Sequence, residues 1–122
     1  IDHKMEAENF HISKEATESL IASNKNHRKI IAVGSTTTRV LESIDLSTLQ
    51  KEGKSGWTER YIFPGQKFNS INHILTNFHL PKSTLYILVC AFADKKLISK
   101  AYNEAMKRKY RFFSYGDAML II

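Results

Sequence analysis

A short polar segment, residues 76–81, lies between two apolar stretches and carries side chains that can do chemistry. It reads Thr-Asn-Phe-His-Leu-Pro, so Asn77 and His79 stand close together. Because a histidine titrates near neutral pH, His79 can serve as an acid, a base or a hydrogen-bond donor. Open α/β sheets bind their ligands where strands end, which is where such a loop would lie. The alternative interpretation is that both side chains only satisfy backbone groups of the loop.

A hydroxyl-rich turn, residues 34–39, is the second candidate site and reads Gly-Ser-Thr-Thr-Thr-Arg. A helix that begins here offers free N–H groups and a partial positive charge to a carboxylate, a phosphate or a ribose. The candidate binding residues are Gly34, Ser35, Thr36, Thr37 and Arg39. The turn is neither the dinucleotide motif G-x-G-x-x-G nor a P-loop, so its spacing alone favours a structural glycine turn.

A third candidate, residues 110–117, reads Tyr-Arg-Phe-Phe-Ser-Tyr-Gly-Asp. Interleaved aromatic and cationic side chains suit stacking on a nucleobase and contact with a phosphate. Arg111 and Tyr115 are therefore candidate substrate contacts, and Asp117 can accept a proton or bind a ribose hydroxyl. A core aromatic strand followed by a turn would explain the two phenylalanines, but it explains the other three residues less well.

The first and third candidates are expected to form one site. Both segments join apolar elements through short polar turns, and both concentrate groups that are costly to bury without a partner. We therefore expect Arg111, Tyr115 and Asp117 to lie near Asn77 and His79.

Local patterns predict the elements that position these segments. Helices are expected over residues 14–26, 36–44, 81–93 and 95–109, and strands over 30–33, 57–63, 71–78 and 119–122, with a surface loop over 46–56. Ser13 is a typical helix N-cap. Short strands interleaved with helices predict an α/β fold, a layered sheet with flanking helices, in a single domain of residues 1–122. The last strand is expected to join the sheet.

Composition excludes several classes of protein. The chain has 122 residues, of which 43% are hydrophobic and 25% are charged, which argues against disorder. No apolar run is long enough to cross a membrane, and no secretory leader is visible. The single cysteine, Cys90, rules out an internal disulfide framework, so a cytoplasmic location is expected. The histidines do not show metal-ligand spacing, and no bound metal is expected.

The net charge of +6 is compatible with a polyanionic partner such as nucleic acid. Four cations, Lys107, Arg108, Lys109 and Arg111, cluster before the C-terminal segment. The simpler interpretation of this cluster is that cations at a helix C-terminus complement the macrodipole.

The sequence contains no G-x-S-x-G motif, so it does not support a serine hydrolase.

Five blocks, in order, resemble the signatures of the QueA family of S-adenosylmethionine:tRNA ribosyltransferase-isomerases. They are residues 31–43, 63–68, 75–85, 88–93 and 110–121. The block at 75–85, Leu-Thr-Asn-Phe-His-Leu-Pro-Lys-Ser-Thr-Leu, is the most specific of them. Two positions depart from the family pattern: Ser35 replaces a threonine, and Glu6 stands where a histidine is expected.

The resemblance implies a fold and a function. The chain is expected to be the C-terminal part of a larger two-domain enzyme, in keeping with its start at Ile1. The family transfers and isomerises the ribosyl group of S-adenosylmethionine onto a 7-aminomethyl-7-deazaguanine already in tRNA. S-adenosylmethionine is then a consumed substrate and tRNA a partner, with no further cofactor. His79 and Asp117 are the expected catalytic residues. The alternative is a non-catalytic RNA- or nucleotide-binding module.

Overall fold

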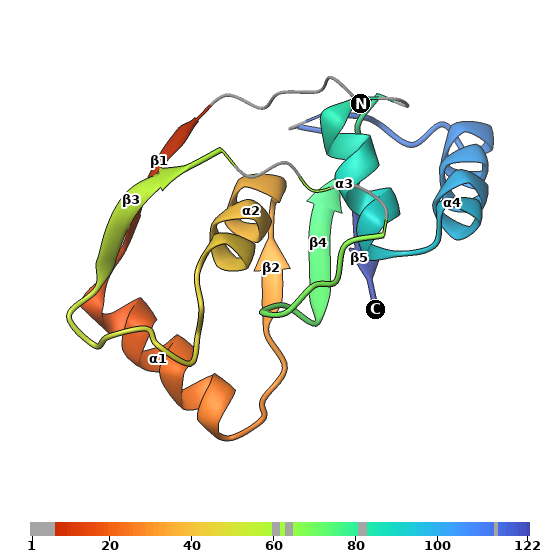
Figure 1. The fold of residues 1–122 in the computed structure, drawn as a ribbon. Coiled ribbons are helices and arrows are strands. Elements are labelled where there is room, and N and C mark those ends of the chain that lie inside the picture. Colours follow the sequence, from red (N-terminus) through yellow and green to blue (C-terminus); the bar gives the residue numbers. More distant parts are fainter. Residues whose placement is uncertain (1–6, 60–61, 63–64, 81–82, 114) are drawn as a thin grey trace.

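The computed structural model describes residues 7–59, 62, 65–80, 83–113 and 115–122. Within these residues the chain forms five strands and four helices (Figure 1). In chain order they are β1 (Glu8–Ile12), α1 (Lys14–Lys25), β2 (Ile31–Val33), α2 (Ser35–Ser43), β3 (Lys54–Thr58), β4 (His73–Asn77), α3 (Thr84–Phe92), α4 (Lys95–Lys107) and β5 (Ala118–Ile121). No helix in the described part of the chain is long and apolar enough to cross a membrane.

A three-stranded sheet in the order β2-β4-β5 organises the fold. β2 and β4 run parallel, and β5 pairs antiparallel with β4, so that Ile74 lies beside both Ala32 and Ile121. A parallel pair needs a long crossover connection, and the chain between β2 and β4 supplies one. The predicted α/β class is confirmed, and the last strand joins the sheet as expected.

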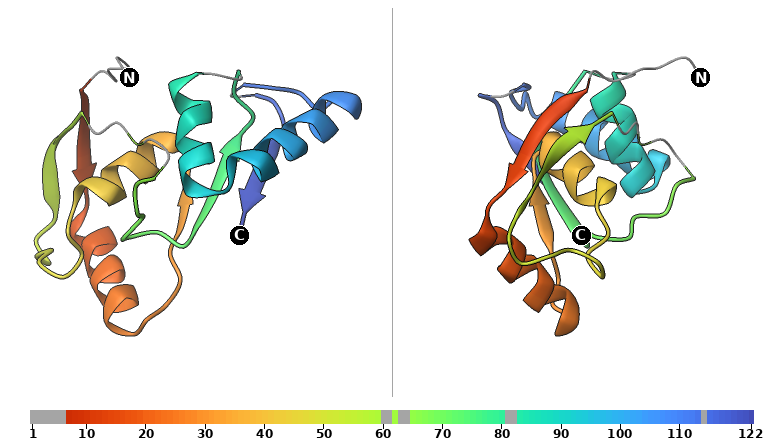
Figure 2. Two further views of the ribbon diagram at one scale, coloured as in Figure 1. Left: turned by 45° about the vertical axis from the view of Figure 1, so that its right-hand side comes forward. Right: turned by 60° about the vertical axis from the view of Figure 1, so that its left-hand side comes forward.

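The two faces of this sheet have different surroundings. α2 and α3 cover one face, where Ala32, Ile74 and Ile121 are buried (Figures 1 and 2). Successive side chains of a strand alternate between faces, so the neighbouring residues point the other way. Ile31 and Val33 on that other face are 54% and 61% exposed. The described residues therefore leave an apolar sheet face uncovered.

A separate two-stranded ribbon corrects the prediction for two segments. β1 pairs antiparallel with β3, from Glu8 beside Thr58 to Ile12 beside Lys54. The N-terminal polar segment was not predicted to form a strand, and β3 begins inside the predicted loop 46–56 instead of at Trp57. In β1 only Phe10 and Ile12 alternate with polar residues, which is a short signal, and in β3 the one large apolar residue, Trp57, is 70% exposed.

Two helices, α1 and α3, begin at a serine that caps their free N–H groups, and α3 begins at Thr84, three residues later than predicted. The Ser13 side chain accepts a hydrogen bond from the Ala16 N–H at 3.1 Å, and Ser83 does the same for Tyr86 at 3.1 Å. α4 is two residues shorter than predicted, since Lys109 adopts a left-handed conformation with φ 57°. The turn that follows carries the chain back to β5.

Candidate functional site

The segment after β4 and the loop 110–117 lie against each other, although they are far apart in sequence. The Asn77 side-chain amide donates to the carbonyl oxygens of Gly116 and Asp117, at 3.4 and 3.3 Å. The Phe113 N–H donates to the Phe78 carbonyl oxygen at 2.9 Å. The structure therefore brings Asn77 to the C-terminal segment, as expected for one shared site.

His79 is half-buried beside this junction and is held by two contacts. Its Nε2 lies 3.2 Å from the Thr76 hydroxyl, and its backbone N–H donates to the Tyr102 hydroxyl at 3.0 Å. Burial lowers the pKa of His79 below its ordinary value, because desolvation disfavours the charged ring. A neutral imidazole at physiological pH has a free nitrogen lone pair and can accept a proton.

An aromatic cluster under His79 fixes the loop from within the core. The Phe78 ring stacks on Phe112, with centroids 5.3 Å apart, and meets Tyr102 edge-on at 5.1 Å. Tyr102 in turn lies 4.8 Å from Tyr86 on α3. Aromatic pairs of this kind contribute beyond their buried area. Phe112 thus belongs to the core, as the structural interpretation of the loop anticipated.

Asp117 closes the loop by bonding to its other end. Its carboxylate accepts a hydrogen bond from the Arg111 N–H at 2.7 Å, and the Asp117 N–H donates to the Arg111 carbonyl oxygen at 2.8 Å. The backbone N–H of Arg111 lowers the pKa of Asp117, with a further contribution from the guanidinium, which lies 3.5 Å from the carboxylate. An ionised carboxylate with a low pKa is a weak proton acceptor at neutral pH, so the geometry suits Asp117 to positioning the loop.

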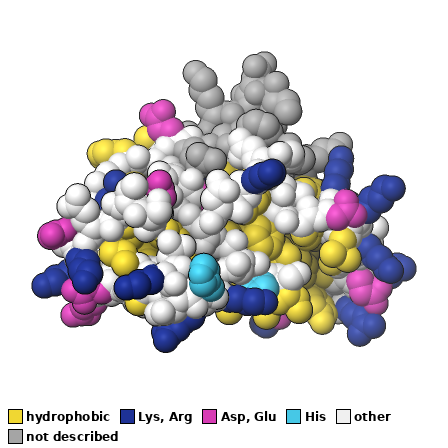
Figure 3. All heavy atoms as spheres, turned by 60° about the horizontal axis from the view of Figure 1, so that its bottom comes forward, with side chains coloured by type: hydrophobic (Ala, Val, Ile, Leu, Met, Phe, Trp, Pro, Cys, Tyr) yellow, Lys and Arg dark blue, Asp and Glu magenta, His cyan; other side chains and the backbone are white. Residues whose placement is uncertain are grey.

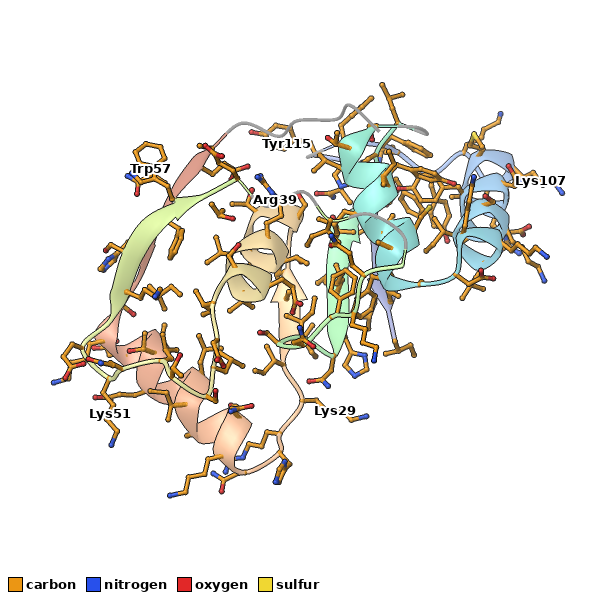
Figure 4. All side chains as sticks on the ribbon, viewed as in Figure 1. Lys29, Arg39, Lys51, Trp57, Lys107 and Tyr115 are labelled. Carbon is orange, nitrogen blue, oxygen red and sulfur yellow. The ribbon has the colours of Figure 1, made fainter. Side chains whose placement is uncertain are left out.

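Gly116 gives the loop a shape that other residues cannot adopt. A Cβ atom there would lie 2.5 Å from the carbonyl oxygens of both Arg111 and Phe112. Phe113 takes a left-handed conformation with φ 70°, and its carbonyl oxygen accepts the Gly116 N–H at 2.9 Å. This compact turn leaves Tyr115 99% exposed, at the upper edge of the molecule in Figure 4.

His79 and Asp117 engage different partners. Among the described residues no hydrogen bond or ion pair joins these two side chains, since His79 contacts Thr76 and Tyr102 while Asp117 contacts Arg111. The first is half-buried over the aromatic cluster and the second lies in the surface loop. The two predicted catalytic residues thus occupy one neighbourhood of the fold in different environments.

The glycine turn lies where the sequence placed it, between β2 and α2. Gly34 has φ 92°, and its N–H donates to the Leu75 carbonyl oxygen at 2.8 Å, which ties the turn to β4. The Thr38 hydroxyl donates back to the Gly34 carbonyl oxygen at 2.9 Å. Open space surrounds the position of a Cβ at Gly34, so the left-handed φ is what favours glycine there.

Thr36 and Thr37 are exposed and line a pocket of about 660 Å³. The remaining lining comes from β1, α1, the start of β2 and α2, and is mostly apolar. It includes Phe10, Ile12, Leu20, Ile30, Ile31, Val40 and Leu41. Small-molecule sites combine such apolar walls with a few polar groups that set orientation, which the two hydroxyls can supply here.

Arg39 is a predicted substrate contact that the structure places inside the fold. Its side chain is 1% exposed and forms an ion pair with Glu8, so it links α2 to the ribbon. An arginine buried to this degree requires hydrogen-bonded partners. Glu6, which stands where the family pattern has a histidine, lies outside the described residues.

Glu42 is a buried carboxylate that the sequence reading did not single out. It is 8% exposed and accepts hydrogen bonds from the backbone N–H groups of residues 69, 70 and 71, at 2.8, 2.8 and 3.3 Å. These contacts order the approach to β4. A glutamate on the apolar stripe of a predicted helix is the signal that would have indicated it.

No group of three potential metal-ligating side chains occurs among the residues that the structure describes. The polar groups near the end of β4 are imidazole, amide, hydroxyl, guanidinium and carboxylate, and those of the glycine turn are hydroxyls. Such groups suit recognition of a nucleotide-like substrate and proton transfer. The fold and these sites define an α/β protein with polar candidate-site loops beside its parallel strands.

The chain belongs to a family of queuosine biosynthesis proteins, whose profile matches residues 1–121. It is 50% identical over 121 residues to the S-adenosylmethionine:tRNA ribosyltransferase-isomerase of Thermoanaerobacter sp. (strain X514). It is 52% identical over 122 residues to the protein of the same name from Staphylococcus saprophyticus. Each comparison covers 99% of this chain but 36% of the relative, so the chain spans about a third of their length.

A solved structure supports the same relationship. The S-adenosylmethionine tRNA ribosyltransferase of Thermotoga maritima superposes with a TM-score of 0.85 at 45% sequence identity. The match covers 93% of this chain and 40% of that protein. The similarity therefore extends through nearly all of the elements described above.

Proposed function

We propose that this chain is part of a tRNA-modifying transferase-isomerase that uses S-adenosylmethionine as a consumed substrate. The enzyme transfers the ribosyl group to 7-aminomethyl-7-deazaguanine in tRNA and isomerises it, giving epoxyqueuosine with release of adenine and methionine. The observation that carries the proposal is 50% identity through the whole chain to a relative of that name. The partners are tRNA and S-adenosylmethionine, no additional cofactor is required, and the cytoplasm is the expected location.

The chemistry requires a base that removes a proton next to the sulfonium, whose positive charge makes that proton acidic. His79 is our candidate, because its half-buried ring is held neutral by burial and an imidazole is ordinarily a stronger base than a carboxylate such as Asp117. Asp117 remains the second candidate from the sequence. Its bonds to the Arg111 backbone support a positioning role, in which it holds the loop beside Asn77.

We assign substrate contacts to two surfaces. Ser35, Thr36 and Thr37, with the helix start at Gly34, offer hydroxyls and N–H groups to the ribose or carboxylate of S-adenosylmethionine. The loop offers Arg111 and Tyr115, together with Asn77, to the tRNA nucleotide. Arg39 is assigned to support of the first surface, because its buried ion pair with Glu8 leaves little of it accessible.

The decisive experiment compares the full-length protein that carries this chain with residues 1–122 alone. Each is incubated with S-adenosylmethionine and precursor tRNA, and nucleosides are analysed by mass. We expect epoxyqueuosine, adenine and methionine from the longer protein and no product from the short chain, which spans about a third of its relatives. Absence of product from a folded full-length protein would contradict the proposal.

An RNA-binding module without catalysis is the second candidate, and the net charge of +6 with an exposed Tyr115 favours it. It predicts that the full-length protein binds tRNA but consumes no S-adenosylmethionine. Adenine release measured in the same incubation separates the two functions.

A further inference from the structure

α4 has one face in the core and another lined with cations. Ile98, Tyr102 and Ala105 form its buried face. Four exposed lysines, Lys95, Lys96, Lys100 and Lys107, together with Ser99, Asn103 and Glu104, surround a shallow depression of about 530 Å³. These four residues are called the lysine face below. Figure 3 shows Lys and Arg side chains gathered at the right-hand edge, on the side where α4 lies in Figure 1.

Charge is concentrated strongly at this element. Residues 94–109 contain six cations and two carboxylates, a net charge of +4 within a chain of net charge +6. The described ion pair here joins Arg108 to Glu104 at 2.8 Å. No ion pair between a described carboxylate and Lys96, Lys100 or Lys107 is present. The lysine face is thus a surface of uncompensated positive charge.

Helix electrostatics does not account for this arrangement. Lys107 and Arg108 lie at the C-terminal end, where the macrodipole stabilises cations. Lys95 and Lys96 lie in the first turn, where it disfavours them, and that turn has no acidic residue. The Asp94 side chain forms no capping hydrogen bond that would offset the cost. Two of these cations therefore sit where the helix itself gains nothing from them.

We propose that the lysine face binds the phosphate backbone of the tRNA, next to the nucleotide that meets the loop 110–117. This inference rests on the proposed function. Lysines act as point charges on phosphates and position an RNA without reading its sequence. α4 has 13 residues and is about 20 Å long, enough to follow several nucleotides. Its last turn leads directly into the loop, so the two contacts form a continuous path along the chain.

The exposed aromatic ring complements this charge. Tyr115 is 99% exposed on a loop whose backbone is held by Gly116 and Asp117, so the ring is accessible on an ordered support. Base stacking on such a ring tolerates any sequence and is usually combined with a positively charged track for the backbone. The lysine face supplies that track in this chain.

The test uses the full-length protein with Lys96→Gln, Lys100→Gln and Lys107→Gln combined. A matched control carries Lys25→Gln, Lys29→Gln and Lys51→Gln, which remove the same charge from exposed positions. Lys29 and Lys51 lie at the lower part of the molecule in Figure 4, away from Lys107. Affinity for precursor tRNA is measured across a range of salt concentrations, with melting temperature as the check on folding.

We expect the lysine-face variant to bind tRNA at least about tenfold more weakly at low salt, while the control binds as wild type. The slope of log affinity against log salt should fall in magnitude by about 2, because each phosphate contact contributes about 0.7 to 0.9. Turnover at saturating tRNA should be unchanged. Arginines at the same three positions should restore the slope, which would exclude loss of packing as the cause.

Two outcomes separate this inference from the proposed function. If the wild type forms epoxyqueuosine and the lysine-face variant has the same slope as the control, the inference is wrong and the function stands. If the wild type binds tRNA with a slope that depends on the lysine face but forms no product, the function is wrong and the RNA surface stands.

Discussion

The glycine turn and the loop 110–117 handle their polar groups in opposite ways. The turn buries its charged residue, Arg39, against Glu8 and leaves two threonine hydroxyls exposed above an apolar pocket. The loop uses its carboxylate to bond its own backbone and leaves Tyr115 and Arg111 exposed. An open, mostly apolar pocket with few polar groups suits a small substrate, whereas an exposed cationic and aromatic loop suits RNA. The difference is consistent with the two substrate surfaces that we propose, each with its own physical requirements.

The largest expected effect is on stability and comes from Arg39. Replacing Arg39 with Met removes the buried member of an ion pair whose other member, Glu8, is 35% exposed, which should cost about 3 kcal/mol of the free energy of unfolding, the low end for buried pairs. Denaturant unfolding of the full-length protein measures this. A folded Arg39→Met variant with normal stability and a raised KM for S-adenosylmethionine would instead show that Arg39 binds substrate directly.

His79 should have the next largest effect, on the chemical step. His79→Gln keeps a polar side chain of similar reach but cannot accept the proton, so kcat should fall about 100-fold or more. tRNA affinity and melting temperature should stay near wild type. Tyr102→Phe is the matched control, since it removes the hydroxyl that holds the His79 backbone and leaves the ring. Equal losses in both variants would point to a structural role for His79.

Tyr115 tests the proposed contact of the loop 110–117 with tRNA. Tyr115→Ala should weaken tRNA binding by about 1–3 kcal/mol, the usual contribution of one stacked base, while Tyr115→Phe should retain binding. The side chain is fully exposed, so neither change should alter stability. Both variants should keep the wild-type KM for S-adenosylmethionine. Unchanged tRNA affinity of Tyr115→Ala would remove stacking on this ring from the proposal.

Thr36 and Thr37 test the proposed contact of the glycine turn with S-adenosylmethionine. Thr36→Val and Thr37→Val preserve shape and each remove one hydroxyl, so kcat/KM for S-adenosylmethionine should fall by about 1 kcal/mol per lost hydrogen bond. tRNA affinity should not change, which contrasts with Tyr115→Ala. If both variants have wild-type kinetics, the turn serves the fold only.

The smallest expected effect is a pH dependence of stability from His79. Its pKa is lowered in the folded chain, so between that value and about 6.5 the unfolded chain binds more protons. Stability should therefore fall as the pH drops through this window and level off below the folded pKa. His79→Gln should lack this component when melting temperatures are compared from pH 7 to pH 5. An identical pH profile in the variant would contradict a lowered pKa.

Elements that depend on neighbouring residues could be predicted from the sequence. Ser13 marks a helix start because a serine oxygen near the free N–H groups caps a helix wherever the chain goes next. The apolar runs at β2 and β4 and the left-handed glycine at position 34 likewise need only near neighbours. The motif blocks were equally readable, and the family they resembled is the one to which the chain belongs.

Which polar groups remain accessible to a substrate depends on contacts between distant parts of the chain. Arg39 and Thr36 are three residues apart, yet one is buried beside β1 and the other is exposed on the pocket rim. The β1–β3 pairing that creates this difference joins residues 42 to 50 positions apart, from Ile12 with Lys54 to Glu8 with Thr58, and only a short apolar alternation in β1 indicates it. Asp117 is a candidate proton acceptor or ribose contact in the sequence, and in the fold its carboxylate accepts a hydrogen bond from a backbone N–H six residues earlier. A side chain's role depends on which distant groups compensate its charge, and only folding brings those groups together.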